Sequence, residues 1–145
     1  MRETPEAEID ELEVLSEFHC LEYLASAALG RIAFQLGENI EMFPVNYAAD
    51  GAVVVFRISS GTRLESCLLG RVAFEVDGWD EKEGVGWSVV LKGVADEVTK
   101  GIDPFSEALR AHRVMPLAPG QRERWIAVYP SEVTGRRFRR SAPRS

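Results

Sequence analysis

The part of this sequence best suited to chemistry is an apolar stretch that ends in arginine and leads through a turn to a second arginine. Residues 53–56 are apolar at every position, Arg57 follows them, and Gly61 stands two residues before Arg63. Guanidinium groups bind anions through charge-assisted hydrogen bonds, and glycine lets a ligand approach the main chain closely. The pattern therefore favours a phosphate-bearing cofactor held on a β scaffold. The alternative is an ordinary link between elements with two solvated arginines.

A short helix is expected directly after this turn, over residues 62–69. Thr62 stands three residues before Glu65, which is the spacing of a capping box at a helix start. The first-turn N–H groups of a helix are unpaired donors with partial positive charge, so they would add to the attraction for a phosphate.

Length and composition indicate one globular domain. The chain has 145 residues, of which 46% are hydrophobic and 28% charged, and these values are ordinary for a globular protein with a sizeable core. No apolar run approaches the roughly 20 residues that a membrane-spanning helix needs. The acidic start at residues 1–6 lacks the apolar core of a secretory signal. We therefore expect a cytoplasmic protein that does not bind membranes.

Charge is distributed unevenly along the chain. The formal net charge is −6, which argues against general nucleic-acid binding. We expect a flexible acidic segment at residues 1–14, a folded domain at residues 15–138 and a basic tail at residues 139–145. The tail is interpreted as a solvated terminus in preference to a polyanion-binding arm.

The cysteines and histidines form no reactive or metal-binding pattern. Cys20 and Cys67 fall in apolar helical patterns and are expected to be buried free thiols. His19 and His112 lie far apart without metal-ligand spacing, so no metal site is predicted.

Short alternating apolar stretches dominate after residue 30 and predict a mainly β fold. One helix is expected over residues 16–28, capped by Ser16, and another over residues 103–113, where Asp103 and Pro104 mark the start. Pro130 is expected to end the last strand. The expected strands occupy residues 31–36, 40–48, 53–56, 72–76, 85–92 and 124–129. Six strands in short meanders with a few short helices indicate a β-barrel with α+β content and no second domain.

Eight short segments, taken in order, carry a resemblance to a known family. They are CLEYLAS at 20–26, GRIAF at 30–34, FPVNY at 43–47, VFR at 55–57, GTR at 61–63, VAFEVD at 72–77, GWSV at 86–89 and VTGRR at 133–137. Together the segments span residues 18–138. The chain resembles the pyridoxamine 5′-phosphate oxidase-like, FMN-binding split-barrel superfamily. It looks most like the short actinobacterial-type members, akin to flavin and deazaflavin oxidoreductases. The resemblance implies a six-stranded FMN-binding split β-barrel with a few short helices.

The resemblance also implies a homodimer in which FMN lies in a cleft at the subunit interface, with the deazaflavin F420 as the alternative cofactor. Carried over position by position, Arg57 and Arg63 would contact the phosphate, helped by Ser60, Gly61 and Thr62. Lysine is common in the family at the position of Arg63. Arginine keeps the charge there and adds a planar fork suited to phosphate.

Other matched positions would meet the flavin ring. Main-chain groups of Val55 and Phe56 would contact it, together with Asn46 and Tyr47 from the neighbouring strand. Trp87 would lie near the ring, either from the same chain or from its partner. Core packing is an equal alternative for that side chain.

The implied function is that of a flavin-dependent oxidoreductase acting on an unidentified small molecule. No residue stands out as a catalytic acid or base, and Glu75 and Asp77 are interpreted as a solvated pair. The Arg/His segment that grips the vitamin's phosphate in true pyridoxamine phosphate oxidases has no counterpart after Tyr129, so that substrate is not expected. A flavin-binding protein without turnover and a haem-binding split barrel stay open. The scarcity of histidine argues against the second.

Overall fold

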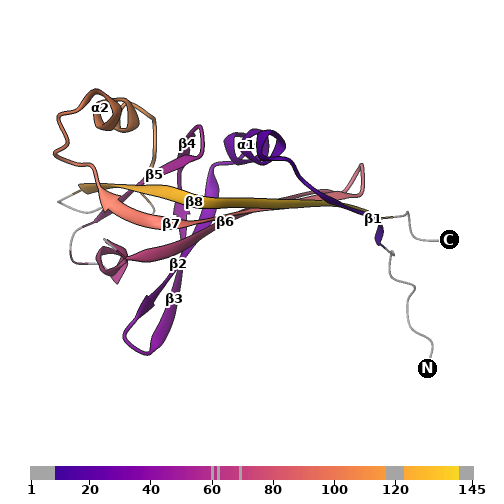
Figure 1. Ribbon diagram of the computed structural model, residues 1–145, viewed down its shortest axis with the longest axis horizontal. Coiled ribbons are helices and arrows are strands. Elements are labelled where there is room, and N and C mark those ends of the chain that lie inside the picture. The colour runs from indigo at the N-terminus through magenta and orange to yellow at the C-terminus, as the bar shows by residue number, and fades with distance from the viewer. Residues whose placement is uncertain (1–8, 60, 62, 69, 117–122, 141–145) are drawn as a thin grey trace.

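A computed structural model of the protein has a single antiparallel sheet of eight strands with short helices beside it (Figure 1). It describes residues 9–59, 61, 63–68, 70–116 and 123–140. The strand order is β3-β2-β6-β7-β8-β5-β4, and β1 pairs with β8 outside this path. The strands are β1 (Ile9–Val14), β2 (Leu29–Leu36), β3 (Asn39–Asn46), β4 (Ala48–Asp50), β5 (Val53–Ser59), β6 (Arg71–Asp80), β7 (Val85–Glu97) and β8 (Glu123–Arg140). The predicted mainly β split-barrel class is confirmed, with eight strands in place of six.

Two α-helices begin where the sequence predicts. α1 (Glu17–Ser26) starts at Ser16, whose hydroxyl caps it, and α2 (Pro104–Arg110) starts at Asp103. The Asp103 carboxylate accepts hydrogen bonds from the main chain and the hydroxyl of Ser106. Both caps satisfy N–H groups that a helix start leaves unpaired. No helix in the described part of the chain is long and apolar enough to cross a membrane.

The helix expected over residues 62–69 is shorter and of a different kind. η1 (Arg63–Cys67) is a 3-10 helix of five residues, and Thr62 lies outside the described residues. The Glu65 carboxylate accepts a hydrogen bond from the main-chain N–H of Gly61, so this acid does turn back on the chain, one residue earlier than a capping box would place it. One 3-10 turn aligns few peptide dipoles, and the argument from an α-helix start is therefore wrong here.

Apolar side chains at alternate positions of the central strands form the core. On β6, Val72, Phe74 and Val76 are buried while their neighbours along the strand are more exposed, as period-two alternation predicts. Residues 54–56 of β5 are all fully buried, so both faces of this strand are covered there. Cys20 and Cys67 are buried free thiols, as predicted.

Residues 9–14 form β1, where the sequence predicts a flexible acidic segment. β1 pairs antiparallel with the outer part of β8, and Glu13 lies opposite Arg137. Nε of Arg137 donates to the Glu13 carboxylate at 3.0 Å. An acid from one end of the chain thus compensates a cation near the other end, a pairing that local composition does not reveal.

The last strand continues past Pro130, where it was expected to end. β8 runs to Arg140, so the first two residues of the predicted basic tail belong to the sheet. The pairing with β7 shifts register between Lys92 and Gly93, and Pro130 lies opposite Gly93. Proline cannot donate to a ladder, and the bulge accommodates it without ending the strand. A Cβ atom on Gly93 would lie 2.0 Å from the Tyr129 carbonyl oxygen, so this close approach requires glycine.

The strand expected over residues 40–48 is divided in two. β3 ends at Asn46, and β4 forms a hairpin with β5 around Gly51, which has a φ of 59°. A positive φ suits glycine, in agreement with the Asp50-Gly51 pattern. β3 is the outermost strand at its side of the sheet, which explains how Pro44 fits within it.

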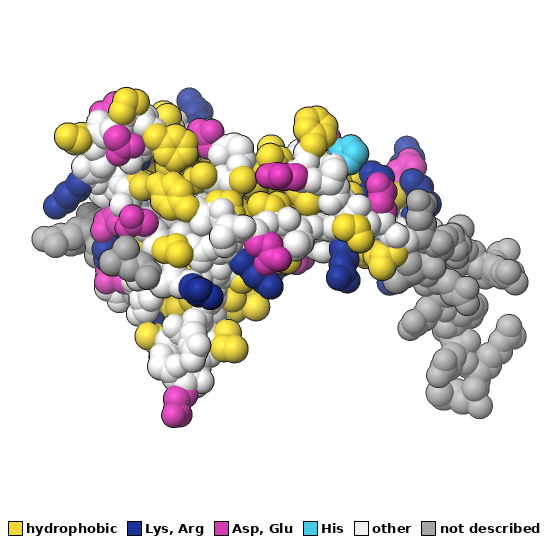
Figure 2. All heavy atoms as spheres, viewed as in Figure 1, with side chains coloured by type: hydrophobic (Ala, Val, Ile, Leu, Met, Phe, Trp, Pro, Cys, Tyr) yellow, Lys and Arg dark blue, Asp and Glu magenta, His cyan; other side chains and the backbone are white. Residues whose placement is uncertain are grey.

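The sheet has a body and a projecting arm. In Figure 1 the outer parts of β7 and β8, with β1, extend away from the end that carries α2, η1 and β5. Exposed apolar side chains gather beside α2 and at the β2–β3 hairpin (Figure 2). Highly exposed apolar side chains there are Ile102 and Met115, which flank α2 in the sequence, and Ile40 and Met42 of β3.

Two isoleucines of the β2–β3 hairpin test this description of the core. Ile32 is fully buried and Ile40 is 78% exposed. We expect Ile32→Ala to lower the free energy of unfolding by about 2–5 kcal/mol, because it removes buried contacts and leaves a cavity. The matched change Ile40→Ala should cost about 0.5 kcal/mol or less. Urea denaturation measures both, and equal losses would contradict the assigned faces of the hairpin.

Candidate functional site

Arg57 lies in β5 in a half-buried setting made by β8 and the segment after α2. Its Nη1 donates to the carbonyl oxygen of Val114 at 2.9 Å, and its Nη2 forms an ion pair with Glu123. The guanidinium carbon lies 5.1 Å from the centroid of the Trp125 ring, its neighbour on β8, a position that allows a cation–π interaction. Nε is buried and has no hydrogen-bond partner among the described residues. Arg57 is therefore held in place, and its Nε–H is a donor without a partner among the described residues.

Arg63 is in contrast an exposed side chain. Its guanidinium is 70% exposed and forms an ion pair with Glu41 of β3 at 2.8 Å. Gly61, two residues earlier, has a φ of 86°, and a Cβ there would meet no atom within 4 Å. The turn before η1 is thus open on the side where a side chain would stand.

The structure gives the two predicted arginines different surroundings. Trp125 and Arg124 are consecutive in β8 and point to opposite faces of the sheet. Arg57 contacts Trp125. Arg124 instead forms an ion pair with Glu65 of η1, the element that carries Arg63. The two predicted phosphate ligands therefore have neighbours that belong to different faces of β8.

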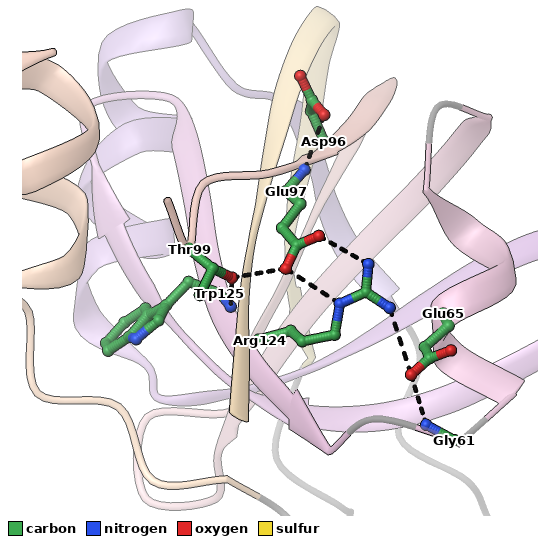
Figure 3. Close-up of polar contacts among 7 residues, drawn as sticks. All are labelled: Gly61, Glu65, Asp96, Glu97, Thr99, Arg124 and Trp125. Atoms are coloured by element: carbon green, nitrogen blue, oxygen red, sulfur yellow. Dashed lines mark hydrogen bonds and ion pairs between the residues drawn. The ribbon is translucent and has the colours of Figure 1, made fainter. Parts of the chain in front are cut away.

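A network around Arg124 joins β8, the end of β7 and η1 at this turn (Figure 3). The pattern of the sequence did not predict this network. Arg124 donates to the Glu97 carboxylate through Nε at 3.0 Å and Nη2 at 2.6 Å, and its Nη1 lies 3.2 Å from Glu65. The Thr99 hydroxyl donates to Glu97 at 2.7 Å and accepts from the main-chain N–H of Trp125 at 2.8 Å. The only signal in the sequence was a charged residue within an otherwise apolar strand.

This network shifts the pKa values of its members toward their charged forms. Hydrogen bonds from Arg124 hold the pKa of Glu97 below its ordinary value, and the hydrogen bonds to Glu97 raise the pKa of Arg124. Beside the pair opens a cleft of about 1100 Å³. It is lined by Gly61, Glu65, Glu97, Thr99, Lys100, Gly101, Glu123 and Arg124. The cleft thus brings the predicted turn together with charged groups from β7 and β8.

The residues predicted to meet a flavin ring have mostly structural settings. The side chains of Val55 and Phe56 are fully buried, so only their main chain can face a ligand. Asn46 is half-buried at the end of β3. The Tyr47 hydroxyl donates to the carbonyl oxygen of Leu24, and burial raises the pKa of Tyr47 to about 12.

One edge of β5 is available near these positions. In the described residues the pairing of β4 with β5 ends at Val55, opposite Ala48. β8 pairs with the other edge of β5 through Ser59. The main chain from Phe56 onward therefore has an edge that β4 does not cover, as the resemblance requires. Ser60 and Thr62 lie outside the described residues, and their predicted contacts stay predictions.

Trp87 lies in a different depression, on the arm. Its ring stacks on that of Tyr23 with 4.6 Å between centroids, and Arg137 lies beside the pair, with Nη1 at 3.4 Å from the Tyr23 hydroxyl. This depression has a volume of about 440 Å³. Its lining residues are His19, Glu22, Tyr23, Ser26, Trp87 and Arg137, none of which lines the cleft at the Gly61 turn. One copy of the chain therefore does not bring Trp87 to that turn.

Glu75 and Asp77, interpreted from the sequence as a solvated pair, share a cation. Arg31 of β2 lies 3.3 Å from Glu75 and 3.5 Å from Asp77. Burial, with the neighbouring Asp77, raises the pKa of Glu75 to about 7. Glu75 is thus less solvated than the sequence suggests, whereas Asp77 is exposed as expected.

Comparison with known proteins identifies the family. The family model described as pyridoxamine 5′-phosphate oxidase matches residues 16–137. This chain belongs to that family. The uncharacterised protein Rv0080 of Mycobacterium tuberculosis is 30% identical over 130 residues, which cover 86% of this chain and 84% of that protein.

Solved structures agree with this assignment. A structure described as the FAD binding protein from Mycobacterium smegmatis is 35% identical, with a TM-score of 0.74, and the match covers 87% of this chain and 97% of that one. A conserved protein of unknown function from Corynebacterium diphtheriae is 29% identical, with a TM-score of 0.71 and coverage of 89% and 99%. The chain is thus a member of the pyridoxamine 5′-phosphate oxidase family and shares the split-barrel fold of a relative described as binding the flavin nucleotide FAD.

The residues at the Gly61 turn fit the phosphate group of such a cofactor. The buried Nε of Arg57 lacks a partner among the described residues, and the guanidinium of Arg63 is exposed. The Gly61 turn is open to close approach. Guanidinium and main-chain N–H groups are the donors that phosphate oxygens accept.

The ion pair between Glu97 and Arg124 predicts a pH dependence of stability. The folded-state pKa of Glu97 lies below its ordinary value of 4.5, so the stabilisation is complete above pH 4.5 and is lost as the pH falls through the folded-state pKa. We expect Glu97→Gln to lower the free energy of unfolding by about 1 kcal/mol at pH 7. In acid, the difference in unfolding free energy between this variant and wild type should become smaller, because Glu97 of wild type is then protonated as well. Urea denaturation at several pH values measures this. Glu81→Gln, in an exposed turn, is the control, and parallel pH profiles for wild type and Glu97→Gln would contradict the assignment.

Proposed function

We propose that this protein binds a flavin nucleotide at the Gly61 turn and uses it as an oxidoreductase acting on a small molecule. The observation that carries the proposal is the half-buried Arg57, on the strand that leads into the open Gly61 turn, whose buried Nε–H has no partner among the described residues. Membership in a family of flavin-binding proteins supports the same site.

In this proposal Arg57 and Arg63 hold the phosphate from two sides, with the main chain of Gly61 between them. The uncovered edge of β5 from Phe56 onward lies along the flavin. A bound flavin supplies hydride and electron transfer at its ring, and the protein orients the ring and excludes water from it.

FMN is the cofactor that the sequence resemblance implies, with F420 as the alternative. The relative from Mycobacterium smegmatis that is described as FAD-binding adds FAD as a third candidate. The cleft of about 1100 Å³ beside the turn leaves room for a ligand that extends beyond one phosphate. Affinity measurements with all three cofactors distinguish them.

We also propose that the complete site needs two copies of the chain. Trp87 and the Gly61 turn line separate depressions, one on the arm and one at the end that carries η1. A partner that lays its arm across this end would bring its own Trp87 to the flavin. The exposed apolar side chains beside α2 and at the β2–β3 hairpin (Figure 2) offer surface for such an interface.

The residues of the site supply little acid or base chemistry of their own. Burial raises the pKa of Tyr47 to about 12 and that of Cys67 to about 11, so both stay protonated at neutral pH. The protein's contribution is therefore binding and orientation. A flavin-binding protein without turnover shares this site, and the measurement below separates the two.

Absorption spectra of the purified protein test the function. We expect saturable binding of FMN, FAD or F420, with a perturbed flavin spectrum. The bound flavin should be reduced by NAD(P)H or the deazaflavin by a matching donor, and reoxidised by a quinone or nitro compound. Binding without reduction by any donor would identify a carrier. Failure to bind all three cofactors would overturn the proposal.

Arg63 provides a test of the phosphate site that spares the fold, since its side chain is 70% exposed. We expect Arg63→Ala to weaken FMN binding by about tenfold or more, the value of one charge-assisted contact, with an unchanged melting temperature. Arg139→Ala, at the far end of β8, is the control with the same change of charge. Equal FMN affinities for the two variants would remove Arg63 from the site.

A further inference from the structure

Each arginine around the Gly61 turn already carries a carboxylate of the same chain. Arg57 is paired with Glu123, and Arg63 with Glu41. Arg124 is paired with both Glu97 and Glu65. A phosphate that approaches this turn therefore meets guanidinium groups whose charge is already compensated.

The main chain of the turn is engaged in the same way. The N–H of Gly61 donates to Oε1 of Glu65, and the same carboxylate oxygen lies 3.2 Å from Nη1 of Arg124 (Figure 3). A main-chain N–H and a guanidinium that converge on one anionic oxygen are the partners that a phosphate oxygen would take. Glu65 thus occupies an anion position of the turn.

The charge balance of the cleft adds to this argument. Among its described lining residues, Glu65, Glu97 and Glu123 carry three negative charges against the two positive charges of Lys100 and Arg124. Arg57, which pairs with Glu123, brings the cluster to neutrality. A phosphate monoester adds about 1.5 to 2 further negative charges at neutral pH. Like charges repel strongly in a partly desolvated site, so a carboxylate must withdraw when the phosphate binds.

The three carboxylates differ in how firmly they are held. Glu97 accepts from Arg124 through two nitrogens and from Thr99, which makes it an anchor for the guanidinium. Glu65 stands on the five-residue η1, and Glu123 stands at the first residue of β8. Glu65 and Glu123 are therefore the carboxylates that can move aside.

We propose that Glu65 and Glu123 are internal competitors for the ligand's phosphate and thereby set how much a phosphate contributes to binding. Glu65 competes at the Gly61 N–H and Arg124, and Glu123 competes at Arg57. In wild type these carboxylates offset part of the affinity that the guanidinium groups and the turn give to the phosphate, so the phosphate adds less to binding than it would without them. This inference rests on the proposed flavin function of the turn.

Isosteric glutamine variants test the competition, because they keep the shape and hydrogen-bonding oxygen and remove the charge. Dissociation constants for FMN and for riboflavin, which lacks the phosphate, are measured by fluorescence titration for wild type, Glu65→Gln and Glu123→Gln. Glu132→Gln is the matched control, since Glu132 pairs with the exposed Lys92 at 3.8 Å away from the cleft. Melting temperatures with and without inorganic phosphate are recorded for all four proteins.

We expect each cleft variant to bind FMN about tenfold more tightly than wild type, with riboflavin affinity unchanged and Glu132→Gln like wild type. Inorganic phosphate should raise the melting temperature of the cleft variants more than that of wild type. Unchanged or weaker FMN binding, with riboflavin binding retained, would overturn the competition and leave the flavin function standing. If no protein binds a flavin, the proposed function fails. A phosphate-dependent rise in melting temperature confined to the cleft variants would then support the competition by itself, and no such rise would overturn it.

Discussion

The hydrogen-bond ladder of β8 is the interaction on which the rest of the structure depends. β8 pairs with β7 along most of its length, with β5 near its start and with β1 near its end. Pairing on both edges satisfies the main-chain polar groups of a strand that runs from the body into the arm. The bulge at Gly93 lets this ladder pass Pro130 without interruption. Because one strand carries both Arg124 and Arg137, the ladder fixes where both depressions lie.

Alternation along β8 then determines the electrostatics of the body. Consecutive residues point to opposite faces, so Trp125 covers Arg57 while Arg124 turns toward η1 and the end of β7. Half-buried guanidinium groups need compensation, because a charge removed from water without a partner costs several kcal/mol. The carboxylates of Glu97, Glu65 and Glu123 supply it. In our proposal, the compensation that stabilises the ligand-free chain also opposes the phosphate of a cofactor.

The distance between the two depressions gives the fold a second constraint. Residues with ring-stacking chemistry, Tyr23 and Trp87, lie on the arm, and residues with phosphate-binding chemistry lie at the other end of the sheet. A rigid ladder between them cannot bend to bring them together within one copy. The apolar side chains that remain exposed beside α2 are the kind of surface that a second copy would cover. Dimerisation and cofactor binding are, in our proposal, one structural requirement.

The sequence predicted what depends on near neighbours, and it did so well. The caps at Ser16 and Asp103, the hairpin turn at Gly51 and the alternating strand β6 all follow from local hydrogen bonding and period-two burial. The glycine turn at Gly61 was likewise predicted from neighbouring residues, and its positive φ agrees with that prediction. These features require only residues a few positions apart.

Tertiary structure decided what depends on residues far apart in the chain. β1 pairs with β8 and brings Glu13 to Arg137 across 124 positions, which no local pattern reports. The predicted α-helix at residues 62–69 gave way to a 3-10 turn whose acid binds Gly61 and Arg124. The sequence by itself determined that cationic donors surround this turn. Only the tertiary structure decided that carboxylates from β3, η1, β7 and β8 form ion pairs with these donors. The reason is that charge compensation depends on which side chains lie close together in the fold and not on their order in the sequence.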